Sequence, residues 1–264
     1  MRVRVNNTLT KPFRHERGVR QGCPTSPLIF KIFINDLLDK IRPIRVEGIP
    51  EGIKGLMFAD DTVILADSES DLNQKLTLID KWMKENHMEI NPSKCGIMDI
   101  KSNDNTNLLG GAILFNGEEI PIVDTYTHLG IEFNSQLDLS AMAKFRLEKG
   151  KGVLDGLTPA LRNGRLPLEY KVMLIRNILV SSLTYGVEIF GMNQTRVNPL
   201  KRVLDNGLKC ILRRSNFCRL RAYEELNLES IYTSSSAARA RGISKWTKTR
   251  GLKREHRVTK AFQI

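Results

Sequence analysis

The spacing of the apolar residues changes near residue 137, and this change limits the folds open to the chain. Up to Gln136 the apolar residues stand mostly in short runs of strand length, broken by turn residues, with two stretches of helical spacing. Beyond that point they recur at helical spacing, in Leu139–Leu157, in Leu168–Leu183 and in Val197–Leu212. This order predicts an α+β fold. We expect a mixed domain at residues 1–136, a helical region at 137–235 and a basic tail at 236–264.

The first helix is expected from Ser26 to about Ile41. Ser26 followed by Pro27 is a helix-start signal, with the hydroxyl at the N-cap and proline at the first helical position. The apolar residues that follow cover most of the helix circumference. A helix of this kind is expected to be buried on more than one side.

Two adjacent aspartates, Asp60 and Asp61, stand between the apolar runs Gly55–Ala59 and Thr62–Ala66 in the stretch GIKGLMFADDTVILADS. Neighbouring carboxylates repel each other, so something must compensate. One interpretation is a hairpin turn, because aspartate is a favoured turn residue. The other is a divalent cation, which relieves the repulsion and makes the proximity useful. These residues alone leave both interpretations open.

Further local signals divide the rest of the first part. Val3 and Val5 before Asn6-Asn7 predict a strand and a turn, and Asn116-Gly117 predicts a second hairpin. Ser68 with Asp71 is close to a capping box and opens a helix to about Asn86. We expect two more strands, at Cys95–Ile100 and His128–Phe133.

The net charge of the chain is +12, which points to a polyanionic partner. Nucleic acid is favoured over a membrane because the sequence has no long apolar run and no lipidation signal. The tail after Ser236 has a single acid, Glu255, against nine basic residues: Arg239, Arg241, Lys245, Lys248, Arg250, Lys253, Arg254, Arg257 and Lys260. This tail is either a solvated end or a surface that contacts phosphates.

Several other classes of protein are disfavoured. The four cysteines form no CxxC pair and no histidine pair has zinc spacing, so reduced thiols are expected. The start of the sequence is polar and alternating, unlike a signal peptide, so we expect the product in the nucleus or cytoplasm. The glycines around Lys151 lack the spacing of a phosphate-binding loop.

Four segments in order, GVRQGCPTSPLIFKIFINDL, MFADDTVILAD, INPSKCGIM and HLGIEF, resemble the successive signature segments of reverse transcriptases. The non-LTR retrotransposon class is most similar, with group II intron enzymes next, and the resemblance covers Val3 to Phe133. It implies a partial polymerase palm, an antiparallel sheet with packed helices, at residues 1–136 and an α-helical thumb after it. It also implies RNA-directed DNA synthesis with Mg²⁺, or Mn²⁺ in its place, an RNA template, a DNA primer and deoxynucleoside triphosphates, and no membrane.

The resemblance assigns roles to individual residues. Asp60 would be the direct metal ligand and Asp61 its less direct partner, with Phe58 and Ala59 beside the primer end. Lys94 would stand near the leaving pyrophosphate as a third catalytic residue, with a plain surface lysine as the alternative. The remaining matches are Gln21 and Gly22 under the template, and Leu129 and Gly130 in a primer-gripping hairpin. For these the alternatives are a helix-entry loop and a core strand.

One departure from the family pattern sets a limit on activity. Reverse transcriptases hold their metals with a further aspartate, on a strand before the RQG segment and within F-x-D-x-x-x-A-F-D. No such segment is present before Gln21, and none of those residues is an aspartate. We therefore expect an N-terminally truncated domain that is inactive alone. The alternative is a non-catalytic RNA- or DNA-binding remnant, or a maturase-like module.

Overall fold

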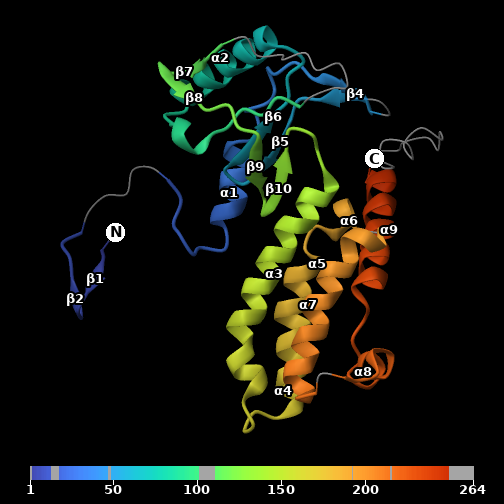
Figure 1. Ribbon diagram of the computed structural model, residues 1–264. Coiled ribbons are helices and arrows are strands. Elements are labelled where there is room, and N and C mark those ends of the chain that lie inside the picture. The colour runs from blue at the N-terminus through green and yellow to red at the C-terminus, as the bar shows by residue number, and fades with distance from the viewer. Residues whose placement is uncertain are drawn as a thin grey trace. The chain divides into compact units, whose positions relative to one another are not determined.

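The computed structural model describes residues 2–12, 18–46, 49–100, 111–191, 193–214 and 216–249 (Figure 1). These residues form two compact units. The first contains the described residues up to Pro92 and those from 111 to Glu119, and the second contains Ser93–Ile100 and the described residues from Ile120 onward. Each is described by itself. Mixed helices and small antiparallel sheets confirm an α+β fold, while the boundary expected near residue 137 stays a prediction.

The first unit is built from short hairpins and two helices. Its helices are α1 (Ser26–Phe33) and α2 (Glu69–Glu85). Its strand pairs are β1 (Arg4–Val5) with β2 (Thr8–Leu9), β3 (Ile44–Val46) with β4 (Ile49–Ile53), β5 (Gly55–Phe58) with β6 (Asp61–Ile64), and β7 (Ile113–Phe115) with β8 (Glu118–Ile120). Among the described residues every sheet has two strands, so β5 and β6 are paired only with each other.

Local turn chemistry explains the hairpins that the sequence predicts. Asn6 and Asn7 have φ of +45° and +66°, and Asn116 and Gly117 have φ of +53° and +84°. Asparagine and glycine tolerate this left-handed region, so both pairs turn the chain tightly. The predicted turns at these two places are confirmed.

Helix α2 begins and packs as its sequence predicts. The Ser68 hydroxyl at the N-cap accepts a hydrogen bond from Asp71 N–H at 3.2 Å. The helix then buries Ile79, Trp82 and Met83. The Trp82 and Phe33 rings form a T-shaped pair with centroids 5.9 Å apart, and the Trp82 indole N–H donates to Asp36 Oδ1 at 3.0 Å. These contacts join α2 to the segment that follows α1.

Helix α1 differs from the prediction in three ways. It ends at Phe33 instead of Ile41, and the chain continues to Ile41 in turns closed by bonds such as Leu37 N–H to Ile34 O. The N-cap is Thr25, which makes no side-chain cap hydrogen bond, and the Ser26 hydroxyl donates to Arg20 O at 2.6 Å instead of capping the helix. The expected burial on several sides is also wrong for this helix, whose exposed apolar side chains are Leu28, Ile29, Ile32 and Phe33.

The second unit contains a hairpin and a helical bundle. The hairpin is β9 (Thr125–His128) with β10 (Ile131–Asn134). The helices are α3 (Leu139–Arg162), α4 (Leu168–Leu174), α5 (Ser181–Thr184), α6 (Val187–Phe190), α7 (Gln194–Leu212), α8 (Arg219–Glu225) and α9 (Ile231–Thr249). A π-helical stretch, Ile175–Val180, joins α4 to α5, and a 3₁₀ turn covers Pro92–Lys94. The three predicted helical regions are therefore confirmed.

Two strand predictions in this unit are corrected. The strand expected at Cys95–Ile100 is reduced to a single parallel bridge between Ile97 and Ile122. The single strand that the apolar pattern predicts at His128–Phe133 is instead a hairpin, as the resemblance implies, with a turn at Leu129 and Gly130 whose φ angles are +48° and +76°. Leucine rarely adopts this conformation, so the alternation of apolar residues gave no sign of the turn.

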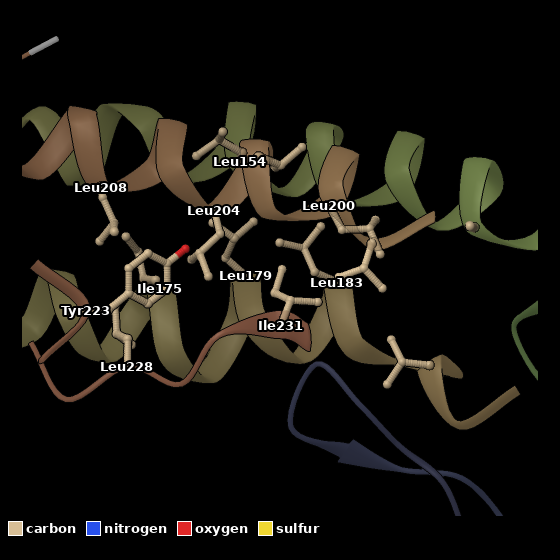
Figure 2. Close-up of a cluster of buried hydrophobic side chains, with 14 of the residues drawn as sticks. Leu154, Ile175, Leu179, Leu183, Leu200, Leu204, Leu208, Tyr223, Leu228 and Ile231 are labelled. Atoms are coloured by element: carbon tan, nitrogen blue, oxygen red, sulfur yellow. The ribbon is translucent and has the colours of Figure 1, made fainter. Parts of the chain in front are cut away.

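The bundle is the principal apolar core. Figure 2 shows Leu179, Leu183, Leu200 and Leu204 pointing toward one another between the helices, and all four are fully buried. Burial of one such side chain contributes about 1.5–3 kcal/mol to folding. Helix α9 closes the core with Ile231 and a fully buried Ser235, so the predicted tail begins inside a packed helix. Residues 250–264 of that tail lie outside the described residues.

Candidate active site

The β5–β6 hairpin presents the two aspartates. Phe58 pairs with Asp61, which leaves Ala59 and Asp60 as a two-residue turn. Ala59 has φ of +54°, a left-handed conformation that is unfavourable for a residue with a Cβ. Asp60 lies in the turn, Asp61 opens β6, and both are exposed. The predicted hairpin is confirmed, and its turn holds two adjacent carboxylates at the surface.

An exposed apolar face flanks Asp61. Residues that face each other across a hairpin lie on the same side, so Phe58 shares its face with Asp61, and Leu56 shares it with Val63. Phe58 is 62% exposed and Leu56 is 54% exposed. Together these neighbouring side chains form a small exposed apolar patch beside the carboxylate. The Asp61 carboxylate can bind a cation, and the face beside it can contact an apolar group.

A buried ion pair fixes the end of β6 to helix α2. Lys75 is 1% exposed, and its ammonium donates to Leu65 O at 2.8 Å, just after β6, and to Asp71 Oδ2 at 2.7 Å. Asp71 also contacts Arg42 at 3.2 Å and accepts from Asp67 N–H. Burial alone raises the pKa of Asp71, but the Lys75, Asp67 and Arg42 contacts outweigh it and hold that pKa below its ordinary value.

Gln21 and Gly22 form the turn that leads into α1. Cys23 N–H donates to Arg20 O at 3.3 Å, and Gly22 has φ of +78°, as the third residue of a tight turn requires. An added Cβ at Gly22 would meet nothing within 4 Å. Both residues are exposed, so the turn leaves open space around its backbone.

Lys94 lies in the second unit, at the end of the 3₁₀ turn, and is exposed. The Tyr126 hydroxyl of β9 donates to Lys94 O at 3.2 Å. Gly96 allows this contact, because a Cβ there would lie 3.0 Å from the Tyr126 ring and 3.1 Å from Val123. The backbone of Lys94 is therefore fixed to the same strand that leads to Leu129.

The Leu129–Gly130 turn is held by two side chains that the sequence did not identify. The Tyr185 hydroxyl donates to Leu129 O at 2.7 Å, and Arg146 Nη2 donates to Gly130 O at 2.6 Å. Only the Tyr-Gly pair at the end of a helical stretch hinted at a bend near Tyr185. Arg146 gave no signal at all, because a basic residue on a helix normally faces solvent.

The structure thus sorts the predicted residues into two sets. Phe58, Ala59, Asp60 and Asp61 lie together on one hairpin of the first unit, which also contains Gln21 and Gly22. Lys94, Leu129 and Gly130 belong to the second unit.

The donor set of the hairpin has the right chemistry for a hard cation. Two exposed carboxylates supply the oxygen ligands that Mg²⁺ prefers. Within the described ranges no group of three or more His, Cys, Asp or Glu side chains is placed to hold a metal ion. Asp60 and Asp61 therefore fit part of a magnesium site. None of the helices in the described part of the chain is long and apolar enough to span a membrane.

Comparison with known proteins defines the class. The family described as "Reverse transcriptase (RNA-dependent DNA polymerase)" matches residues 1–133, half of the sequence. The chain belongs to this family. Its curated relatives narrow the class further, to the reverse transcriptase domains of non-LTR retrotransposons, and the resemblance seen in the sequence is confirmed.

Three of these relatives show the extent of the similarity. The Pol polyprotein of a type-1 R2 element from Nasonia vitripennis is 36% identical over 96 residues, which are 36% of this chain and 9% of the relative. An R2 polyprotein from Popillia japonica is 26% identical over 71% of this chain and 31% of its own length. The RNA-directed DNA polymerase from mobile element jockey of Drosophila melanogaster is 27% identical over 66% of this chain and 19% of its own length.

The matches therefore span less than a third of the length of these curated relatives. No solved structure matches the chain significantly.

Proposed function

We propose that the chain forms part of a polymerase palm at residues 1–136, followed by a thumb at 137–235 and a basic tail at 236–264, and that it takes part in RNA-directed DNA synthesis. The observation that carries the proposal is the β5–β6 hairpin, with two adjacent exposed carboxylates at its turn. In such a turn the two side chains start from neighbouring backbone positions and can approach one cation. The location of the protein in the nucleus or cytoplasm stays a prediction.

Asp60 and Asp61 would hold the divalent metal in this proposal. When bound, Mg²⁺ supplies positive charge beside the attacking and leaving oxygens of a phosphoryl transfer. The protein's own contribution is to hold the carboxylates in place, and the Lys75 ammonium does this indirectly by fixing Leu65 at the end of β6. The exposed Phe58 ring offers an apolar surface beside them for the sugar or base at the primer end.

The other predicted residues receive matching roles. Gln21 and Gly22 form an open turn whose backbone can approach a template strand. The Lys94 ammonium would neutralise charge on the leaving pyrophosphate. The Leu129–Gly130 turn would contact the primer. The substrates are an RNA template, a DNA primer and deoxynucleoside triphosphates.

Metal binding tests the proposal at its centre. We expect the chain with an RNA–DNA primer-template to bind more Mn²⁺ than the primer-template alone, observed as a further loss of the free-ion signal in electron paramagnetic resonance. Asp60→Asn together with Asp61→Asn should remove this binding, because amides carry no charge to offset that of the cation. Asp155→Asn, an exposed carboxylate on α3, is the matched control and should bind as the wild type does. Equal Mn²⁺ binding by the double variant would refute the assignment.

A non-catalytic nucleic-acid-binding module is the second candidate. It is favoured by the incomplete set of acidic groups in the described ranges and by the basic residues Arg241 and Lys245, both exposed on α9. The same titration separates the two candidates. A chain that binds primer-template but shows no Mn²⁺ binding through the aspartates is the binding module.

A further inference from the structure

The Leu129–Gly130 turn requires a left-handed conformation that Gly130 adopts readily but Leu129 does not favour. Leu129 has φ of +48°, and a side chain with a Cβ is strained there. The hairpin consists of β9 and β10 alone among the described strands, and two-stranded hairpins are only marginally stable by themselves. Contacts from outside the hairpin must therefore hold this turn.

Two such contacts come from the helical bundle of the same unit. Tyr185, which ends α5, donates its hydroxyl proton to Leu129 O at 2.7 Å, and Arg146 of α3 donates to Gly130 O at 2.6 Å. Bonds to two consecutive carbonyl groups fix both peptide planes. In a trans peptide the N–H lies opposite the C=O, so the Gly130 N–H is directed away from the Tyr185 hydroxyl.

Arg146 and Tyr185 also contact each other. The Arg146 guanidinium carbon lies 4.8 Å from the centre of the Tyr185 ring, a cation–π distance. Gly186 has φ of +81° and lets the chain beside Tyr185 come close to β10, since a Cβ there would lie 3.0 Å from Ile131. The Tyr185 side chain is nevertheless half exposed, so both it and the turn lie at the surface.

Burial of the Arg146 guanidinium group is energetically unfavourable if the side chain serves only to fill space. It is 8% exposed, and its Nε finds no hydrogen-bond partner among the described residues. A buried unpaired N–H is unfavourable, and an apolar side chain of similar length would fill the same space without that penalty. What an apolar side chain cannot supply is the donor to Gly130 O.

We propose that Arg146 and Tyr185 are positioning residues that orient the Leu129–Gly130 turn toward the end of a DNA primer. This role rests on the primer contact proposed above for the Leu129–Gly130 turn. It adds the two side chains through which the helical bundle sets the orientation of the turn. Neither residue touches the primer in this role. They act through the turn, so removal of either donor should weaken recognition of a primer end and spare general affinity for nucleic acid.

The test compares two RNA–DNA hybrids of equal overall length that contain the same RNA strand. In one the DNA 3′ end is recessed, and in the other both ends are blunt. Fluorescence anisotropy gives the ratio of the two dissociation constants for each protein. We expect the wild type to prefer the recessed end, and Tyr185→Phe to reduce that preference about 3- to 10-fold, the effect of one lost hydrogen bond. Arg146→Lys should retain more of the preference than Arg146→Met, because lysine keeps a donor.

Tyr170→Phe, an exposed tyrosine on α4, is the matched control and should keep the wild-type ratio. All proteins are compared at a temperature where circular dichroism shows them fully folded. An unchanged ratio in Tyr185→Phe, or an equal loss of affinity for both ligands, overturns the positioning role alone. A wild type without any preference for the recessed end overturns the primer contact itself, and the positioning role with it.

Discussion

Ala59 is strained at the point where the two aspartates are presented. Replacement by glycine should relieve the strain of the left-handed conformation, although glycine loses more chain entropy on folding. The net result should be an increase in the free energy of unfolding of about 0.5–1 kcal/mol. Urea unfolding of Ala59→Gly against the wild type measures this gain. The control is Ala112→Gly, for which φ is not positive and a loss is expected. A less stable Ala59→Gly would show that the Cβ makes a contact that outweighs the strain.

Asp60 and Asp61 lead to a prediction about activity. The purified chain should not extend a DNA primer on an RNA template in Mg²⁺, because two carboxylates from one turn leave a metal ion short of protein ligands and the described residues provide no larger acidic group. Primer extension followed by gel electrophoresis measures this. Template-dependent incorporation that disappears in Asp60→Asn would contradict the prediction.

At the scale of elements, two glycines of α3 provide a matched pair. A Cβ at Gly150 would overlap Leu183 Cδ2 and lie 3.2 Å from Leu183 Cγ, and Leu183 is fully buried. Gly150→Ala should therefore destabilise the bundle by about 1–3 kcal/mol. A Cβ at Gly152 meets nothing within 4 Å, so Gly152→Ala should stabilise by about 0.5–1 kcal/mol through helix propensity. Thermal unfolding measures both, and equal effects would refute the packing argument.

Helices α7 and α8 share a buried polar network that predicts a pH effect. The Tyr223 hydroxyl donates to Asp205 Oδ1 at 3.0 Å, and Arg219 contacts Asp205 Oδ2 at 3.0 Å. Burial and the nearby Asp205 charge raise the pKa of Tyr223 above its ordinary value. The folded state thus holds this proton more tightly, so the stability it contributes is complete below about pH 10 and is lost as the pH rises beyond that.

Tyr223→Phe tests this effect. It should lower the free energy of unfolding at pH 8 by about 1–2 kcal/mol, since Asp205 loses a buried donor. Between pH 8 and pH 10.5 the variant should lose less stability than the wild type, because the other groups titrate alike in both proteins. Urea unfolding at both pH values gives the comparison, and Tyr170→Phe should follow the wild type. Parallel losses in the wild type and Tyr223→Phe would contradict the assignment.

The sequence predicted elements whose cause is local. The turns at Asn6-Asn7, Ala59-Asp60 and Asn116-Gly117 were correct because aspartate, asparagine and glycine determine a turn within a few residues. The limit of α1 at Phe33 was missed because it depends on distant contacts. The Asp36 carboxylate accepts from Trp82 of α2, and Ile34, Leu37 and Ile41 are buried by the turns that follow the helix.

The site was predictable to the same degree. Adjacent carboxylates between two apolar runs marked Asp60 and Asp61 as a turn or a cation site, and the resemblance to reverse transcriptases then implied a hairpin that presents them to a metal. The apolar pattern alone did not show the turn at Leu129, which only the resemblance placed in a hairpin, since the groups that stabilise it, Arg146 and Tyr185, lie 16 and 56 residues further along the chain. Likewise, the pattern of α1 predicted an apolar helix but carried no information about what covers it.

At the scale of the whole molecule, the net charge of +12 predicts salt-dependent binding to nucleic acid. Each neutralised phosphate contributes about −0.9 to the slope of log K against log salt on duplex DNA, or about −0.7 on single strands. Removal of residues 250–264, which carry Arg250, Lys253, Arg254, Arg257 and Lys260, should lower both affinity and slope while leaving helix α9 to Thr249 in place.

Anisotropy titrations at several salt concentrations measure the slope. Asp60→Asn with Asp61→Asn is the control, and it should leave affinity unchanged or slightly raised because it removes negative charge. A slope that survives the truncation would show that residues 250–264 are a solvated end and that the main basic surface lies elsewhere.

The π-helical stretch Ile175–Val180 has a consequence for changes in chain length. A π turn holds one residue more than an α turn, so the helix from Leu168 to Thr184 contains an extra residue at this point. Deletion of one residue inside the stretch would let regular α turns close while both flanks keep their neighbours. The same deletion within α3 would rotate everything beyond it by about 100°. Related chains are therefore expected to lose a residue at this place more readily than within α3.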